Sequence, residues 1–343
     1  MDKRVVFAVA GSGKTKLIVD RLCLEKRSLI VTYTIDNTRN LEGRIRQKFG
    51  CIPPNIHLMT YFSFLHGFCF RPFLSYQMGT SNLCFEAPEY GKVTPTTTEL
   101  SHYKTNNGLI YSNRIAKAII KFRKVELVTD RLSKYFDELY IDEVQDLSAN
   151  DFNLLIELCS AEIDILMVGD FYQHTYDTSK DGNIRKSLHK DYNSYAKSFK
   201  ETGIDIDTTS LLKSHRCAPE VCQFVSDRLG IEIESHRTDS VAVNIVDSEQ
   251  RANELVKDSN IIKLFYSDSK KYACYGKNWG KSKGEDGYQD VAIVLTAGAE
   301  KELKKNRRVT LPPSTLSKLY VACTRANGNL YLIPPKYLKS WKI

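Results

Sequence analysis

The sequence lacks a long hydrophobic run, and this absence excludes several protein classes. No segment of its 343 residues approaches the roughly 20 apolar residues that a membrane-spanning helix requires. The apolar stretch at residues 5–10 follows Lys3 and Arg4 but is shorter than the core of a secretory signal. We therefore expect a soluble, cytoplasmic protein that has no membrane partner.

Cysteine pairs of the metal-binding kind are also missing. The nine cysteines are scattered along the chain, and none belongs to a Cys-x-x-Cys motif. This distribution argues against a zinc knuckle and suits a reducing compartment. The most closely spaced pair is Cys217 and Cys222, which we interpret as ordinary thiols rather than as metal ligands.

Internal repeats, low-complexity tracts and proline-rich linkers are absent as well. The domain organisation is therefore inferred from the alternation of predicted strands and helices along the chain. Strands are predicted at residues 28–33, 138–141 and 163–168, and helices at 113–122 and 150–158. The last third repeats the pattern, with strands at 240–246, 260–266 and 291–295. Such alternation predicts an α/β fold with parallel sheets, and the length is sufficient for two domains.

A glycine-rich turn follows the first apolar strand. It consists of Ala10, Gly11, Ser12, Gly13, Lys14 and Thr15. In a phosphate-binding loop, small residues let backbone N–H groups close on the phosphates of a nucleotide. Lys14 would reach the β and γ phosphates, and Thr15 would ligate Mg²⁺. The pattern predicts binding of a nucleoside triphosphate, although Gly-Lys-Thr also occurs by chance in unrelated chains.

Acidic and amide side chains follow two other predicted strands. The strand at 138–141 runs into Asp142 and Glu143. One carboxylate at a strand end can hold the water shell of Mg²⁺, and the next can orient an attacking water. The strand at 163–168 is followed by Gln173, whose amide can sense a γ-phosphate. A solvated turn is the alternative for two adjacent acids, but their position after an apolar strand favours a phosphoryl-transfer site.

Eight short motifs run in order along the chain. They lie at residues 10–15, 31–34 with Arg39, 60–64, 142–146, 169–170 with Gln173 and Tyr176, 214–216, 281–285 and 320–326. In this order they resemble the superfamily 1 helicases of the UvrD/Rep group. The resemblance implies two RecA-like P-loop NTPase domains with parallel sheets and the nucleotide cleft between them. It places the first domain at 1–205, with a short helical insertion at about 65–112, and the second at 206–343.

The resemblance also implies roles in the nucleotide site. Residues 10–15 would bind the triphosphate, and Thr15 and Asp142 would hold Mg²⁺. Glu143 would be the catalytic carboxylate, and Gln173 would link the γ-phosphate to the nucleic-acid site. In relatives the adenine lies between an arginine and a tyrosine, and two further residues close on the γ-phosphate and ribose. The residues at these places are Lys16, His215, Gly284 and Glu285.

Two arginines resemble the paired arginine fingers of the family. Arg216 and Arg325 would neutralise the charge that develops on the transferred phosphoryl group, because guanidinium groups match phosphate geometry. The alternative roles are a surface ion pair for Arg216 and a helix-end charge for Arg325.

Hydroxyl and aromatic side chains match the family's nucleic-acid contacts. These residues are Thr32, Tyr33, Arg39, Thr60, Tyr61 and Tyr176. Hydroxyls for phosphates and aromatic rings for bases suit single strands without sequence preference. Phe62, Phe64 and Phe68 lie at helical spacing, so we expect them in the core rather than against bases.

The function that we expect is a motor on nucleic acid. The net charge of +8 favours a polyanionic partner. The resemblance implies that the chain uses Mg²⁺ and ATP. Another NTP or dNTP is the alternative, because no glutamine-containing segment that would read adenine precedes the loop. We expect a translocase or helicase on single-stranded DNA, with 3′ to 5′ polarity by resemblance. RNA is the alternative substrate.

A second functional class stays open at this point. The chain can also be a nucleotide-hydrolysing switch that gates a partner protein, such as a nuclease, without unwinding duplex. The long accessory insertions of the family are missing between Arg216 and Lys281 and are short at 65–112. We therefore expect that a protein partner or an oligomer is needed for unwinding.

Overall fold

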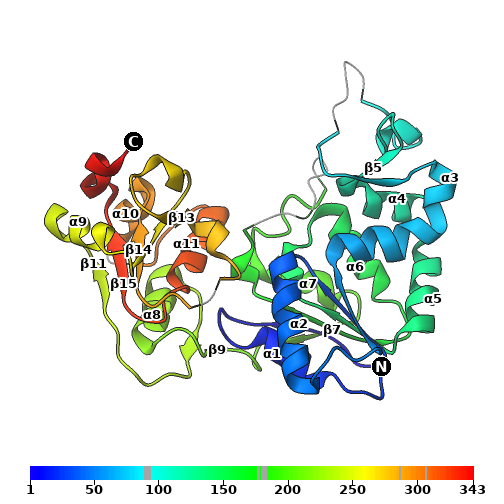
Figure 1. The fold of residues 1–343 in the computed structure, drawn as a ribbon, viewed down its shortest axis with the longest axis horizontal. Helices are drawn as coiled ribbons and strands as arrows, with labels where there is room; N and C mark the ends of the chain where they lie inside the picture. The colour runs from blue at the N-terminus through cyan, green and yellow to red at the C-terminus, as the bar shows by residue number, and fades with distance from the viewer. Residues whose placement is uncertain (89–93, 176–177, 179–183, 286, 306) are drawn as a thin grey trace. The chain divides into compact units, whose positions relative to one another are not determined.

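The chain folds into two compact units, drawn in Figure 1. The computed structural model describes residues 1–88, 94–175, 178, 184–285, 287–305 and 307–343. Unit 1 comprises Met1–Val6, Thr15–Gly169 and Tyr176–Asp207, and unit 2 comprises Phe7–Lys14, Asp170–Thr175 and Thr208–Ile343. Each unit combines a parallel sheet with helices, which confirms the predicted α/β class.

Unit 1 is built on a six-stranded sheet with the order β3-β2-β6-β7-β1-β8. The strands are β1 Lys3–Phe7, β2 Ser28–Thr32, β3 Ile56–Thr60, β6 Glu138–Ile141, β7 Asp164–Gly169 and β8 Asp205–Asp207. The pairs β2–β3, β2–β6, β6–β7 and β1–β8 are parallel. Every residue of β2 and β6 is buried, as in strands that are covered on both faces. The strands predicted at 28–33, 138–141 and 163–168 are thereby confirmed, with small shifts at their ends.

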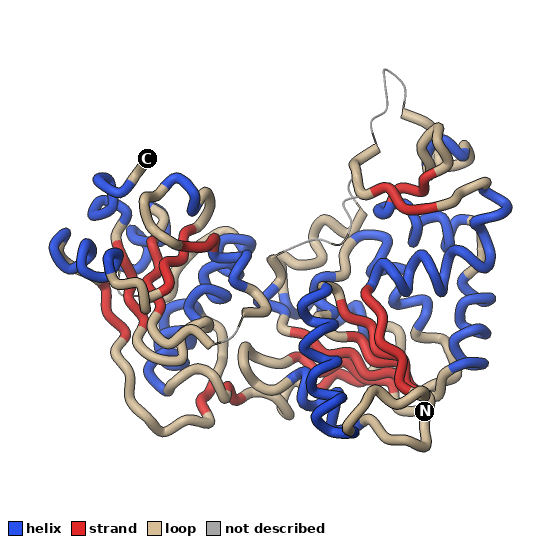
Figure 2. The backbone as a smooth tube through the Cα atoms, viewed as in Figure 1, coloured by secondary structure: helices blue, strands red, loops and turns tan. Residues whose placement is uncertain are grey.

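Helices flank the strands of this sheet, as Figure 2 shows. They are α1 Lys14–Arg21, α2 Ile35–Phe49, the helix Ser63–Ser75, α3 Tyr76–Met78, α4 Ile115–Lys121, α5 Val125–Tyr135, α6 Ala149–Leu158 and α7 Tyr192–Lys200. Helix α2 begins after Thr34, whose hydroxyl accepts a hydrogen bond from the Asn37 amide at 3.1 Å. It ends at Gly50, which has the left-handed φ of 79° that favours glycine. The helices predicted at 113–122 and 150–158 correspond to α4 and α6.

The insertion expected as helical at 65–112 also contains strands. β4 Asn82–Cys84 pairs in parallel with β5 Leu109–Tyr111. Phe64 and Phe68 are buried on the helix Ser63–Ser75, and their rings stack with centroids 5.8 Å apart. These two phenylalanines are core residues, as predicted. The prediction is wrong for Phe62, which has helical backbone angles but is only half-buried.

Unit 2 has its own five-stranded sheet with the order β11-β15-β14-β12-β13. The strands are β11 Val243–Ile245, β12 Ile262–Phe265, β13 Gly276–Asn278, β14 Val291–Val294 and β15 Leu330–Ile333, and all their pairings are parallel. β9 Lys213–Ser214 and β10 Glu234–Ser235 form a separate parallel pair. The predicted strands at 240–246, 260–266 and 291–295 are confirmed as β11, β12 and β14.

The helices of unit 2 cover a buried core. They are α8 Pro219–Phe224, α9 Glu249–Lys257, α10 Ala297–Leu303 and α11 Pro313–Cys323. Trp279 is fully buried in this core, and its indole N–H donates to the Leu264 carbonyl at 3.0 Å. Across the ranges that the structure describes, no helix combines the length and apolar character needed to cross a membrane.

Candidate functional site

The predicted phosphate loop connects β1 to α1. Gly11 and Gly13 have left-handed φ values of 70° and 94°, which glycine adopts without strain. A Cβ on Gly11 would lie 2.7 Å from the Cβ of Arg216, so the close approach at this point also requires glycine. The Ser12 hydroxyl donates to the Val9 carbonyl at 2.8 Å and fixes the turn. Lys14 then opens α1, whose first amides form a helix N-terminus suited to anions.

A buried hydroxyl ties this loop to the residues that follow β7. The amide of Ala10 donates to the Tyr320 hydroxyl at 3.0 Å, and that hydroxyl donates to Asp170 Oδ2 at 2.9 Å. Asp170 also accepts from the Tyr172 amide at 3.1 Å and from Gln173 Nε2 at 2.9 Å. Burial and the Asp170 charge raise the pKa of Tyr320 well above its usual value, so the hydroxyl keeps its proton. The amide of Gln173 is therefore held in place.

The predicted acidic pair lies at the end of β6. Asp142 is buried, and its Oδ1 accepts a hydrogen bond from the Glu143 amide at 2.9 Å. Glu143 has a left-handed backbone, with φ 56° and ψ 43°, which is strained for a residue with a side chain. Gln145, which is fully buried, donates from Nε2 to Glu143 Oε2. The Glu143 carboxylate is thus aimed by both its backbone and Gln145.

Thr15 and Asp142 have the chemistry of a Mg²⁺ site. A threonine hydroxyl and a carboxylate are hard oxygen donors, which Mg²⁺ prefers. Both residues belong to unit 1, at the start of α1 and at the end of β6. The donor set therefore fits the expected metal.

Both predicted arginine fingers are held by backbone carbonyls within unit 2. Arg216 donates from Nη1 to the Thr324 carbonyl at 3.1 Å. Arg325 is buried just after α11 and donates from Nη1 to the Glu285 carbonyl at 2.9 Å. The carbonyl of Thr324, the residue next to Arg325, thus holds the Arg216 guanidinium.

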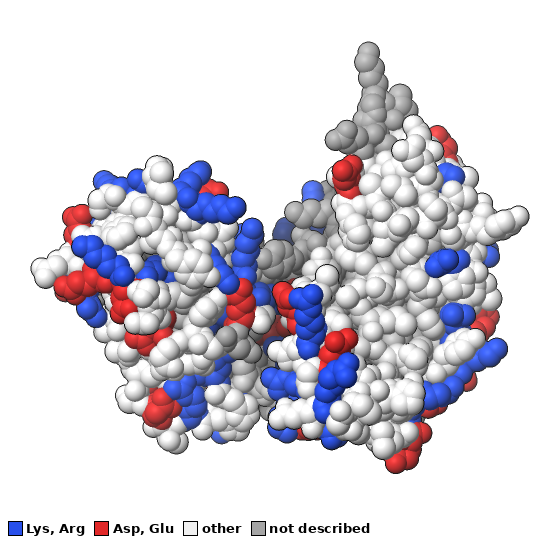
Figure 3. All heavy atoms as spheres, in the orientation of Figure 1, with Lys and Arg blue, Asp and Glu red and all other residues white. Residues whose placement is uncertain are grey.

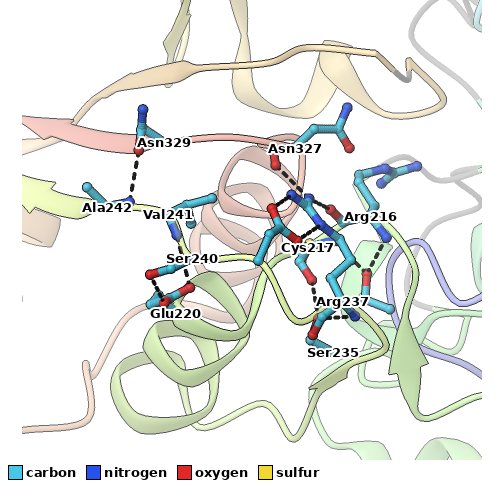
Figure 4. A network of polar contacts seen from close by, with 12 residues as sticks. Arg216, Cys217, Glu220, Ser235, Arg237, Ser240, Val241, Ala242, Asn327 and Asn329 are labelled. Atoms are coloured by element: carbon cyan, nitrogen blue, oxygen red, sulfur yellow. Dashed lines mark hydrogen bonds and ion pairs between the residues drawn. The ribbon is translucent and has the colours of Figure 1, made fainter.

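A second contact between these segments runs through Arg237 (Figure 4). Its Nη1 donates to the carbonyl of Arg216 and, at 2.5 Å, to that of Asn327. Asp239 orients the guanidinium by accepting from its Nε at 2.8 Å. The Ser235 hydroxyl accepts from the Arg237 amide, also at 2.8 Å. Arg237 is a functional candidate that the sequence analysis missed.

The remaining predicted nucleotide contacts lie in three places. The His215 ring stacks on that of His236 with centroids 4.0 Å apart, and the His215 amide donates to the Gly11 carbonyl at 2.9 Å. Lys16 pairs with Asp20 at 2.5 Å on the exposed face of α1. The third place is the segment of Gly284, which has a left-handed φ of 81°. Glu285 beside it accepts from Lys277 Nζ at 2.6 Å and from the Tyr288 hydroxyl.

The predicted nucleic-acid residues differ in their exposure. Thr32 and Tyr61 are buried, whereas Tyr33 and Thr60 are half-buried. Burial and the neighbouring Asp151 carboxylate raise the pKa of Tyr61 well above its usual value. A small pocket brings several predicted residues together, and its lining includes Thr32, Tyr33, Tyr61, Asp142 and Glu143.

The two other predicted nucleic-acid residues are Arg39 and Tyr176. Arg39 is exposed on α2, with Nη1 3.5 Å from Asp36. Tyr176 lies outside the described residues.

Comparison with known proteins gives one family-model match to part of the chain. Residues 77–186 match the family model of the UvrD/REP helicase N-terminal domain. The resemblance to the UvrD/REP helicases is confirmed. The matched range contains Asp142, Glu143 and Gln173, whereas the phosphate loop precedes it. No curated protein matches the chain.

A solved helicase structure shares the fold of this chain. An arterivirus nonstructural protein 10 (helicase) in complex with DNA matches with a TM-score of 0.50 and 15% identity, over 98% of this chain and 63% of that one. The PRRSV helicase matches with a TM-score of 0.47 and 12% identity, over 99% of this chain and 54% of that one. The chain thus spans less than two thirds of the length of either protein. The arterivirus match supports the RecA-like architecture, while the cleft expected between the two domains stays a prediction.

Proposed function

We propose that this chain is a nucleoside-triphosphate hydrolase that moves along single-stranded nucleic acid as a helicase-type motor. The observation that supports this most directly is the buried chain of hydrogen bonds from Ala10 through Tyr320 and Asp170 to Gln173. It joins the loop that would carry the phosphates to the amide that would sense the γ-phosphate. We keep 1–205 and 206–343 as the proposed domains.

The phosphate loop and the strand-end acids would perform the hydrolysis. Lys14 would contact the β and γ phosphates, and Thr15 and Asp142 would hold Mg²⁺. The metal neutralises charge on the phosphoryl oxygens when it is bound. Glu143 would orient the attacking water and accept its proton, and Gln145 would keep that carboxylate aimed.

Unit 2 would supply the positive charge for the transition state. Arg216 and Arg325 would stabilise the charge that spreads over the transferred phosphoryl oxygens. Their positions are supported by the carbonyl contacts at Thr324 and Glu285 and by the bridge that Arg237 makes. His215, stacked on His236, would offer a ring face to the nucleobase.

The nucleic acid would contact unit 1 at the carboxyl ends of β2 and β3. Tyr33 follows β2, Thr60 ends β3, and Arg39 adds a positive charge from α2. A net charge of +8 supports a polyanionic ligand, although Figure 3 shows acidic and basic side chains interspersed on the face in view. One structural neighbour is complexed with DNA, so we propose single-stranded DNA as the substrate. We further propose 3′ to 5′ movement, and unwinding that depends on a partner protein or a second copy.

Hydrolysis measured with ATP and the other nucleotides, with and without single-stranded DNA or RNA, tests the proposal. We expect Lys14→Ala to abolish nucleotide binding or turnover. Glu143→Gln should keep binding and lose hydrolysis, because Asp142 remains as a metal ligand. Glu25→Gln, a change at an exposed position, is the matched control. Hydrolysis by Glu143→Gln at the parent rate would show that the assigned role is wrong.

A further inference from the structure

Three aromatic rings from separate segments of unit 1 form a continuous row. Tyr33 follows β2, Phe62 precedes the helix Ser63–Ser75, and Phe85 follows β4 in the insertion. The ring centroids of Tyr33 and Phe62 lie 6.3 Å apart, and those of Phe62 and Phe85 lie 5.1 Å apart at an interplanar angle of 88°. The row therefore starts at a predicted nucleic-acid residue and ends in the insertion.

The outer end of this row is open to solvent. Phe85 is 66% exposed, and every other phenylalanine that the structure describes is buried or half-buried. A phenylalanine ring has no polar atom to hydrate, and leaving it in water forgoes about 1.5–3 kcal/mol of burial free energy. Its edge contact with Phe62 covers only part of the ring. The exposure of Phe85 suits a ring that becomes covered when a ligand binds.

The neighbouring residues indicate the kind of ligand. Thr60 pairs in register with Thr32 at the ends of β3 and β2, and its hydroxyl lies 2.9 Å from the Ser63 hydroxyl. The Thr60 hydroxyl is half-buried and that of Ser63 is exposed. Hydroxyls beside an aromatic row suit a nucleic-acid strand, because hydroxyls can bind its phosphates while the rings stack on its bases. Tyr61 is buried beside the row, so its ring cannot stack on a base.

We propose that Tyr33, Phe62 and Phe85 form a stacking platform for the unpaired bases of single-stranded nucleic acid, with Phe85 extending it onto the insertion. This inference rests on the proposed function, because it places a base-binding surface next to the predicted strand contacts. The insertion then grips the strand itself. Base stacking on aromatic rings tolerates every sequence, since each base has a π face.

The test is the affinity of the full chain for a fluorescent oligo-dT strand, measured by anisotropy at one fixed salt concentration. Loss of one stacked base costs about 1–3 kcal/mol. We therefore expect Phe85→Ala to raise Kd by about 5- to 150-fold. Tyr76→Ala is the matched control, because Tyr76 is a fully exposed aromatic residue on α3, outside the row. It should bind like the parent.

Two further variants separate stacking from simple apolar contact. Phe85→Leu keeps an apolar side chain but removes the ring, so it should bind as weakly as Phe85→Ala. Phe85→Tyr keeps the ring and should bind like the parent. Equal affinity of Phe85→Ala, Tyr76→Ala and a parent that binds oligo-dT would overturn the platform and leave the proposed function standing. A parent that binds neither oligo-dT nor oligo-U at low salt would overturn both.

Discussion

Tyr320→Phe is expected to destabilise unit 2 although it removes a single oxygen atom. The hydroxyl accepts from the Ala10 amide at 3.0 Å and donates to Asp170 Oδ2 at 2.9 Å, and all three residues are buried. Phenylalanine keeps the ring and its packing, so no sizeable cavity arises. The change therefore isolates the two hydrogen bonds.

The magnitude follows from what each partner retains. Ala10 loses the acceptor that Tyr320 provides, and leaving a buried donor unsatisfied costs about 1–3 kcal/mol. Asp170 loses one donor but keeps the Tyr172 amide and Gln173 Nε2, which limits its loss to about 1.5 kcal/mol. We expect the free energy of unfolding to fall by about 3 kcal/mol.

Tryptophan fluorescence in urea measures this loss directly. Both tryptophans of the chain, Trp279 and Trp341, lie in unit 2, so their emission reports its unfolding. The midpoint and slope of the transition give the free energy. Tyr266→Phe is the matched control, because that hydroxyl lies 3.4 Å from Thr315 Oγ1 in a partly buried setting. The control should lose about 0.5 kcal/mol.

The pH dependence provides a second check on the same variant. Burial and Asp170 raise the pKa of Tyr320 above its unfolded value of about 10. A group whose folded pKa is raised stabilises the fold below its unfolded pKa, and this contribution is lost only as the pH rises past it. The difference between parent and variant should therefore stay constant from about pH 6 to 9. Equal stability of Tyr320→Phe and Tyr266→Phe would refute the reasoning.

Two further predictions concern contacts made by arginines. Arg237→Ala should lower kcat of hydrolysis by about 10- to 100-fold with little change in KM, because the segments that carry the proposed fingers lose their bridge. Arg251→Ala, at an exposed position on α9, should match the parent, and equal kcat for both variants would contradict the bridge. Hydrogen bonds from Arg27 lower the pKa of Asp137 to about 2, so its stabilisation is present above about pH 4 and is lost as the pH falls through about 2. The Tm difference between parent and Asp137→Asn should shrink over this range, and a constant difference would show that the pair is not responsible.

The sequence was sufficient to predict where the site lies along each strand. Apolar runs of four to six residues marked β2, β6 and β7, and polar residues directly after them had to lie at one edge of a parallel sheet. Asp142 and Gln173 were found in this way. This sequence pattern is local, because the apolar strand and the turn that follows it both lie within about ten residues.

The contacts that aim these side chains were not predictable. Arg237 reaches carbonyls 21 and 90 residues away, from a segment next to a strand of two residues, and no local pattern marks such a bridge. Tyr320 lay within a recognised motif, but its partner Ala10 is 310 residues distant. Phe62 also has helical backbone angles, but it lies two residues before Phe64, and residues two apart do not share a face of a helix.

Gly169 illustrates how packing completes what a motif only begins. Its backbone is not left-handed, so glycine is not required by the backbone conformation. Glycine is required because there is no room for a side chain. A Cβ at this position would overlap Gln145 Oε1 and lie 2.8 Å from Val144 Cγ1. Gln145 cannot retreat without releasing Glu143, because it is fully buried and its amide holds that carboxylate. The end of β7 therefore helps to aim the acid at the end of β6, and the strand-end glycine belongs to the proposed catalytic site although it carries no side chain.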